Sequence, residues 1–218
     1  FVVVVAARAR VIVAPPGIHL RHAGRSEVDE VAGGFRAAVL GGGSMGLLHL
    51  LVIKAARPAA KVLVVDPVAE RRALAERLGA DATAAPGEPA VEAARALAGD
   101  GVDAVFDTVG GGALLRAALT LTREGGSVVL FAHAPDGEPA DFDLNDLFKY
   151  ERRIIGSYSG ALAEQARVFE LIAAGRLDPV PLVSHTFPLD QFEAGYALAR
   201  NRQALKVLFT PSSKAGAG

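Results

Sequence analysis

A glycine-rich turn between an apolar strand and an apolar helix is the feature that most constrains the fold of this chain. Residues 37–40 are apolar and lead into Gly41-Gly42-Gly43-Ser44-Met45-Gly46, which contains the spacing G-x-G-x-x-G. An apolar helix follows, and a second apolar strand over residues 61–65 ends at Asp66, twenty residues after Gly46. The glycine spacing alone is weak evidence in a glycine-rich chain. A strand before it, a helix after it and an acid at this distance together predict a dinucleotide-binding unit.

The three glycines of the spacing have different physical tasks in such a unit. Gly41 permits the sharp turn from strand to helix, Gly43 has no Cβ and lets a pyrophosphate approach the backbone, and Gly46 lets the helix pack closely on the strand. The helix begins near Ser44, so its free N–H groups and its positive dipole end point at the phosphates. The alternative is an α/β turn that binds nothing.

Asp66 is predicted to select the cofactor. A carboxylate at this position accepts hydrogen bonds from both hydroxyls of the adenosine ribose and repels a 2′-phosphate. The sequence therefore favours NAD over NADP.

Strands and helices alternate along most of the chain with short connections, which predicts an α/β fold. The predicted strands are apolar on both faces, as in a parallel sheet covered by helices on both sides. With the glycine turn after the first strand, we expect a Rossmann doubly wound parallel sheet in the order 3-2-1-4-5-6, with ligands beyond the carboxyl ends of the strands. The predicted strands span residues 37–40, 61–65, 82–84, 102–107, 127–131 and 153–157. The first predicted helix begins near residue 44, and the others span residues 68–78, 90–97, 113–121 and 144–150.

The two ends of the chain read differently. Residues 2–5 form a β-branched run that predicts a strand, with a turn at 14–17. After a predicted helix over 162–174 we expect a strand over 182–187, a helix over 189–200, a strand over 206–209 and a frayed end over 211–218.

Composition excludes several classes of protein. The formal net charge of −1 gives no electrostatic argument for binding nucleic acid or an anionic membrane. The chain has no cysteine, which excludes disulfides and thiolate zinc sites within it and is compatible with the cytoplasmic location that we expect. The apolar stretch 45–53 is too short to span a bilayer.

From Gly41 onward the sequence resembles the medium-chain dehydrogenase/reductase family, and within it the zinc-type alcohol, polyol and threonine dehydrogenases. The matching segments are Val39 to Gly46, Leu78-Gly79-Ala80-Asp81, Asp107-Thr108-Val109-Gly110, Phe148 to Ser159, and Ala204 to Leu208. The resemblance implies an NAD-dependent oxidoreductase that transfers hydride between an alcohol and NAD.

The resemblance also implies a cofactor domain inserted into a GroES-like catalytic domain. On that basis residues 1–35 are expected to be a remnant of the catalytic domain, 36–178 the Rossmann domain, 179–211 returning catalytic-domain segments and 212–218 a disordered tail. Most of the family's catalytic half, including its cysteine zinc ligand and its Gly-His-Glu motif, has no counterpart here. We therefore expect a truncated chain that is inactive alone and assign no metal ligand. A non-catalytic dinucleotide-binding or interaction module derived from the family is the alternative.

The resemblance can be carried over residue by residue only for the cofactor. Its phosphate loop matches Gly41, Gly43, Ser44, Met45 and Gly46, and its ribose acid matches Asp66. Arg71 matches a basic position beside the adenosine, although an ordinary helix-surface arginine is the alternative. The cofactor trough and nicotinamide region are expected at Thr108, Val109, Phe131, Ala132 and His133, with Ser157 and Tyr158 as weaker candidates.

Other polar residues have a structural and a functional interpretation. His133 is a candidate proton relay, but a loop histidine has many other roles. His49 is expected to be a packed core histidine rather than a ligand, and Asp107 either caps a loop or touches the cofactor. Structural or surface roles are expected for His19, His22, His185, Glu27 and Glu30. The family commonly pairs through an edge strand, so a homodimer through residues 153–157 is a further expectation.

Overall fold

The computed structural model describes residues 34–158, 162–201 and 203–211. The chain forms two compact units with the boundary between Leu177 and Asp178. Several predictions lie outside the described residues: the strand at 2–5, the turn at 14–17, the remnant domain before residue 34, His19, His22, Glu27, Glu30 and the tail after 211.

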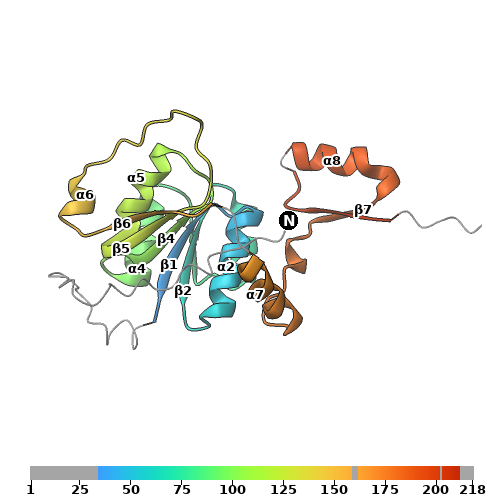
Figure 1. Ribbon diagram of the computed structural model, residues 1–218, viewed down its shortest axis with the longest axis horizontal. Coiled ribbons are helices and arrows are strands. Elements are labelled where there is room, and N and C mark those ends of the chain that lie inside the picture. The colour runs from blue at the N-terminus through green and yellow to red at the C-terminus, as the bar shows by residue number, and fades with distance from the viewer. Residues whose placement is uncertain (1–33, 159–161, 202, 212–218) are drawn as a thin grey trace, which may run out of the picture. The chain divides into compact units, whose positions relative to one another are not determined.

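The first unit contains a six-stranded parallel sheet in the order β3-β2-β1-β4-β5-β6, which confirms the predicted topology (Figure 1). Its strands are β1 (Arg36–Leu40), β2 (Lys61–Val65), β3 (Ala82–Ala84), β4 (Val102–Asp107), β5 (Thr122–Leu130) and β6 (Arg153–Gly156). Leu40 pairs with both Val65 and Asp107, and Leu130 pairs with Asp107 and Gly156. The carboxyl ends of five strands are therefore level, and the loops that follow them share one edge.

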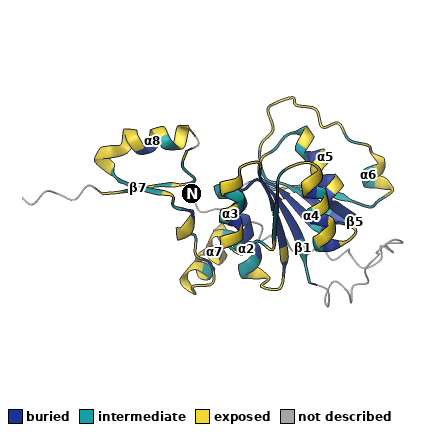
Figure 2. Cartoon of the chain, turned by 180° about the vertical axis from the view of Figure 1, so that it is seen from behind, coloured by how far each residue is buried: buried dark blue, intermediate teal, exposed yellow. Residues whose placement is uncertain are grey.

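Helices cover both faces of this sheet (Figure 1). They are α2 (Ser44–Ala56), α3 (Ala69–Arg77), α4 (Glu88–Ala98), α5 (Gly112–Leu121), α6 (Asn145–Phe148) and α7 (Leu162–Ala173). One core cluster joins Leu63 and Val105 of the strands to Ala94 of α4 and Leu119 of α5. The strands are mostly buried, as the dark blue ribbons of Figure 2 show. Burial on both faces explains why the strand sequences are continuously apolar.

Strand β5 begins earlier than expected. It starts at Thr122 rather than at residue 127, and its pairing with β4 shifts register between Val102 and Ala104. Gly126 lies inside the strand, where an added Cβ would be 2.5 Å from Thr122 Cγ2. Gly125 and Gly126 therefore mark an irregularity within the strand.

The second unit consists of β7 (His185–Pro188), β8 (Val207–Thr210) and α8 (Phe192–Arg200), with the short 3-10 helices η1 (Val180–Leu182) and η2 (Leu189–Gln191). The predicted strand 182–187 is wrong in its first part, because prolines at 179 and 181 place residues 180–182 in a 3-10 turn. The predicted helix 189–200 begins as η2 before it becomes α8. Strands β7 and β8 pair in parallel.

Among the described residues, no helix combines the length and the apolar character needed to cross a bilayer.

Candidate dinucleotide-binding site

The turn after β1 can be built only with glycine at its first position. Gly41 has a φ of +100°, and its N–H donates to the carbonyl of Val65 at 2.8 Å. A Cβ on Gly41 would lie 2.7 Å from Val109 Cγ2 and 2.8 Å from Thr108 Oγ1. Both the backbone conformation and the neighbours therefore exclude a side chain.

The other two glycines of the spacing have opposite surroundings. A Cβ on Gly46 would overlap the carbonyl oxygen of Gly41, so α2 touches the end of β1 backbone to backbone. Around Gly43 no atom lies within 4 Å of the position of a Cβ. Gly43 is also the N-cap of α2, and no side chain in the described part of the chain caps this helix. Uncapped N–H groups beside open space are the arrangement that binds anions at helix N-termini.

Asp66 lies against this turn and is only 2% exposed. Its Oδ2 accepts a hydrogen bond from the Gly42 N–H at 2.7 Å, and its Oδ1 accepts one from the Val68 N–H at 2.8 Å. Arg71 Nη1 is 3.6 Å from the same Oδ2. A carboxylate offers about four lone-pair positions. Asp66 therefore holds the turn and keeps capacity for further donors.

Arg72 is a residue of this region that the sequence analysis did not single out. Its Nη1 donates to the carbonyl of Asp66 at 2.7 Å and to that of Pro67 at 3.0 Å. It therefore fixes the backbone between β2 and α3. The only sequence signal was its position beside Arg71 in the first turn of a helix after an acid.

The end of β4 supplies a second loop at the same edge of the sheet. Asp107 is buried, and its Oδ1 accepts hydrogen bonds from the N–H groups of Val109 and Gly110 at 2.9 Å each. This is the loop-capping role that was one of its two interpretations. Thr108 Oγ1 donates to the carbonyl of Leu40 at 2.7 Å. The Val109 side chain is left 54% exposed beside the glycine turn.

The end of β5 lines a pocket of about 330 Å³ together with the end of β6. His133 is exposed and stacks edge-to-face against Tyr158, with ring centroids 5.5 Å apart. Five of the seven residues expected for the cofactor trough and nicotinamide region line the pocket, namely Phe131, Ala132, His133, Ser157 and Tyr158, whereas Thr108 and Val109 do not. The structure thus brings the predicted cofactor residues together in two adjoining groups, one at the glycine turn and one here.

Three consecutive glycines, Gly110 to Gly112, let the loop between β4 and α5 pack closely against the segment after β5. A Cβ on Gly110 would overlap the carbonyl of His133, and a Cβ on Gly112 would overlap that of Pro139. Glu138 Oε1 accepts a hydrogen bond from the Gly112 N–H at 2.8 Å. The carboxylate therefore caps the first turn of α5, where the chain itself offers only Gly111 as N-cap.

His49 is fully buried, which confirms the expectation of a core histidine. Its Nδ1 lies 2.8 Å from the carbonyl oxygen of Met45, and its ring packs against Phe106 and Phe131. Burial lowers the pKa of His49 to about 4, although the hydrogen bond to Met45 acts in the opposite direction. The imidazole is therefore neutral near pH 7.

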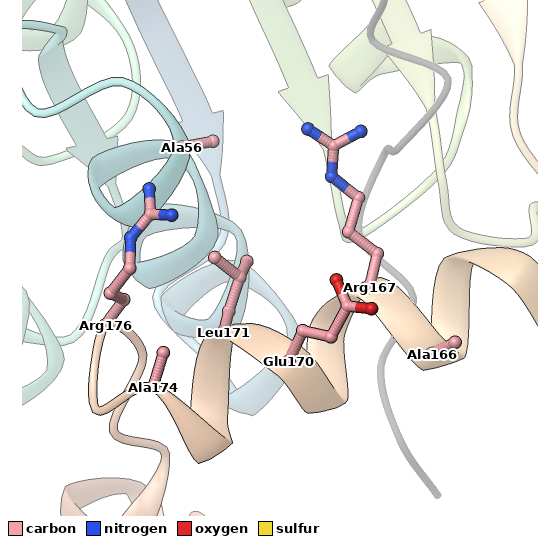
Figure 3. A pocket seen from close by; sticks show the side chains of 7 residues that line it. All are labelled: Ala56, Ala166, Arg167, Glu170, Leu171, Ala174 and Arg176. Atoms are coloured by element: carbon pink, nitrogen blue, oxygen red, sulfur yellow. The ribbon is translucent and has the colours of Figure 1, made fainter.

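The described residues do not fit a zinc ion, because among them no three His, Asp or Glu side chains are grouped to hold a metal. A larger hollow of about 610 Å³ lies between the end of α2 and α7 (Figure 3). Arg167 and Arg176 flank it, and Arg176 donates to the carbonyl of Ala55 at 2.9 Å. Its lining shares no residue with the predicted site, so size alone does not identify the functional pocket.

Comparison with known proteins is consistent with this geometry. Residues 45–174 match the family described as zinc-binding dehydrogenase. L-threonine 3-dehydrogenase of Bacillus velezensis is 33% identical over 189 residues, which cover 85% of this chain and 53% of that protein. Sorbitol dehydrogenase of Bombyx mori is 28% identical over 80% of this chain and 51% of that protein. The structure of the alcohol dehydrogenase TADH from Thermus sp. ATN1 aligns with a TM-score of 0.73 and 33% identity over 82% of this chain and 51% of that one. The chain spans about half the length of the curated relatives it matches.

Proposed function

Because this chain belongs to the zinc-binding dehydrogenase family, we propose that its first unit binds NAD(H) at the glycine turn. One observation carries the proposal: open space surrounds Gly43, while Gly46 holds the uncapped start of α2 against the backbone of Gly41. A diphosphate is complementary in charge to the N–H groups at the start of α2, which have no side-chain partner among the described residues. The absence of a Cβ at Gly43 lets it reach the backbone.

The same site gives the cofactor its orientation. Asp66 accepts hydrogen bonds from the adenosine ribose and disfavours a 2′-phosphate, so NAD is preferred to NADP. Arg71 flanks the adenosine in this proposal, and its Nη1 lies 3.6 Å from Asp66 Oδ2. The nicotinamide end then lies along Thr108 and Val109 and reaches the loop that contains Phe131, Ala132 and His133.

The chemistry that we propose is hydride transfer between NAD and an alcohol or polyol. The threonine, sorbitol and alcohol dehydrogenases named above support this class of reaction. In this proposal residues 36–178 are the cofactor domain of a cytoplasmic enzyme, and residues 179–211 are segments of its catalytic domain. His133 is the candidate for moving a proton near the nicotinamide.

We further propose that the 218-residue chain alone binds the cofactor without oxidising alcohols. Removal of hydride from an alcohol is assisted by a Lewis acid. The chain has no cysteine to supply the thiolate ligand of a zinc-type site, and the described residues group no three other ligands. The same observation favours a second candidate function, a non-catalytic dinucleotide-binding module.

Two measurements on the purified chain test these proposals. Isothermal titration with NADH and with NAD is expected to show binding, and an absence of heat with both nucleotides at saturating concentrations would refute the assignment of the turn. Alcohol oxidation with added Zn²⁺ is expected to be undetectable. Robust turnover would refute the proposed dependence on further ligands and would also reject the non-catalytic candidate.

We also propose a homodimer through the outer edge of β6. This strand lies at the end of the sheet and is paired only with β5 among the described strands. The Ser157 N–H donates to Leu130, so the N–H of Gly156 points to the free edge. Light scattering is expected to show a dimer for the native chain and a monomer for Gly156→Pro, which removes that donor at an edge where proline is tolerated. Equal masses would reject this interface.

A further inference from the structure

The His49 imidazole has an unusual hydrogen-bonding state. Since the Met45 carbonyl can only accept, the proton lies on Nδ1, and Nε2 is left as an acceptor. That Nε2 is buried and has no hydrogen-bond partner among the described residues. A buried acceptor without a partner costs stability. If this position needed only apolar volume, leucine would avoid that cost.

The surroundings of the ring indicate what histidine contributes. On one side it is tied to Met45 in the first turn of α2. On the other side it stands nearly perpendicular to Phe131, at an interplanar angle of 78° and a centroid distance of 4.7 Å, and it also packs 5.6 Å from Phe106. Such edge-to-face contacts are directional.

Phe131 is the residue through which this packing reaches the pocket. It is the first residue after β5, its N–H donates to the carbonyl of Asp107 at 2.9 Å, and it lines the pocket next to His133. The Nδ1 hydrogen bond fixes the plane of the His49 ring. The plane of that ring in turn limits where the Phe131 ring can lie.

We propose that His49 is a positioning residue that sets the loop 131–133 relative to the glycine turn, through its Nδ1 proton on Met45 and its ring against Phe131. The inference rests on the proposed function, in which the turn binds the diphosphate and the loop contacts the nicotinamide. His49 contacts no ligand itself. It keeps the two ends of the site at a fixed separation.

Two substitutions separate the ring from the donor. His49→Asn keeps an N–H donor near the position of Nδ1 and removes the ring, whereas His49→Phe keeps an aromatic ring and removes the donor. Loss of the ring contact in His49→Asn is expected to weaken NADH binding about tenfold. His49→Phe keeps a ring but loses the hydrogen bond that orients it, and is expected to weaken NADH binding by a smaller factor, about threefold. ADP-ribose, which lacks the nicotinamide, is expected to bind both variants within about twofold of native.

The ratio of the two affinities is the readout that a purely structural role would not change. A general loosening of the core lowers the affinity for ADP-ribose and for NADH alike. Equal losses for the two ligands in His49→Asn, or no loss for either, would overturn the proposal. His185→Asn, at a histidine in β7, is the matched control and is expected to leave the ratio unchanged.

A second measurement needs no ligand. In ¹H–¹⁵N spectra of the free chain, the amide signals of Phe131, Ala132 and His133 are expected to shift in His49→Asn and to return towards their native positions in His49→Phe. If the native chain binds neither nucleotide, the dinucleotide proposal fails, and these signals decide the role of His49 separately. Signals that stay in place in a folded His49→Asn chain would overturn it.

Discussion

The carboxylate of Asp66 accepts a hydrogen bond from the backbone N–H of Gly42 at 2.7 Å, so the acid that ends β2 also holds the turn that follows β1. Two neighbouring strands thereby share one polar contact at the carboxyl edge of the sheet. The residue proposed to select the ribose and the turn proposed to bind the diphosphate form one unit. Changes at either place are expected to affect both.

Asp66→Ala is expected to weaken NADH binding and to reduce the preference for NADH over NADPH, because the ribose acceptor and the charge that repels a 2′-phosphate are both lost. The variant also leaves the buried Gly42 N–H without a partner, at a cost of about 1–3 kcal/mol in stability. Titrations with both nucleotides measure the ratio, and Asp66→Asn serves as control because it keeps an oxygen acceptor. An unaltered ratio in Asp66→Ala would remove this residue from the site.

Gly43→Ala and Gly46→Ala are expected to fail in different ways although each adds one methyl group. At Gly43 the new Cβ meets no atom within 4 Å and φ is −74°, so the expected loss of stability is only the cost of alanine at an N-cap, about 1 kcal/mol. Binding of NADH is expected to fall sharply, because the methyl group occupies the approach of the diphosphate.

At Gly46 the methyl group would overlap the backbone of Gly41, and a stability loss of about 3 kcal/mol is expected from overpacking. Urea unfolding and NADH titration of both variants provide the comparison. A Gly43→Ala chain that binds NADH normally would contradict the assigned place of the diphosphate, and a fully stable Gly46→Ala chain would contradict the helix–strand contact.

Acid is expected to destabilise the first unit through His49. The pKa of His49 in the folded chain is lowered from 6.5 to about 4, so the unfolded chain binds an extra proton between these values. The contribution of neutral His49 to the free energy of unfolding is therefore fully present above pH 6.5. It is lost as pH falls towards 4, by on the order of 3 kcal/mol in total. Urea midpoints across this range measure the slope, and His49→Phe is expected to flatten it. An unchanged slope in that variant would assign the effect to other groups.

Asp81 gives a separate acid transition at lower pH. Burial alone would raise the pKa of Asp81, but hydrogen bonds from the Lys54 and Lys61 side chains and from the Val62 N–H outweigh it and lower the pKa from 3.8 to about 2. The stability that these contacts contribute is present above pH 3.8 and is lost as pH falls through 2. In Asp81→Asn the urea midpoint is expected to fall near pH 7, with no change in the slope between pH 6.5 and 4. A changed slope there would show that the two transitions are not independent.

Glu138→Ala is expected to loosen the segment after β5, because the Gly112 N–H at the start of α5 loses its carboxylate acceptor. The expected cost is about 1 kcal/mol, as for other helix caps. Hydrogen exchange at Gly112 is expected to become faster. Asp136→Ala, two residues away in the same loop and exposed, is the matched control. Equal exchange in the two variants would show that the cap does not hold the loop.

The sequence predicted the sheet order because the glycine turn identified the first strand, and the continuous apolar strands required helices on both faces. It predicted the ends of elements less well. The strand predicted from residue 182 begins only at His185, because Pro179 and Pro181 place Leu182 in a 3-10 turn. The start of β5 was missed because it depends on the irregular pairing of Thr122 with Val102 of β4, which the local sequence does not show.

Within the candidate site, the positions of residues were predictable from strand order, whereas their individual contacts were not. That Asp66 lies at the edge of the sheet near the glycine turn follows from strand order and was predictable. The hydrogen bond to Gly42, the bonds of Asp107 to its own loop, and the packing of His49 on Phe131 depend on side-chain positions fixed by tertiary structure. Asp107 shows the limit most clearly, since its position in the sequence allowed two roles and only the folded structure shows the hydrogen bonds from Val109 and Gly110.

Gly46 packs directly on the carbonyl of Gly41, so the contact between α2 and β1 involves no side chain that could change its rotamer. These peptide groups belong to a sheet on one side and a helix on the other and have little freedom to rearrange. The start of α2 is therefore expected to keep its position relative to β1 when surrounding side chains move. We therefore expect any adjustment to the proposed dinucleotide at the other group of residues, after β5, where His133 is exposed. The proposed site thus has one rigid end, which is formed by backbone alone.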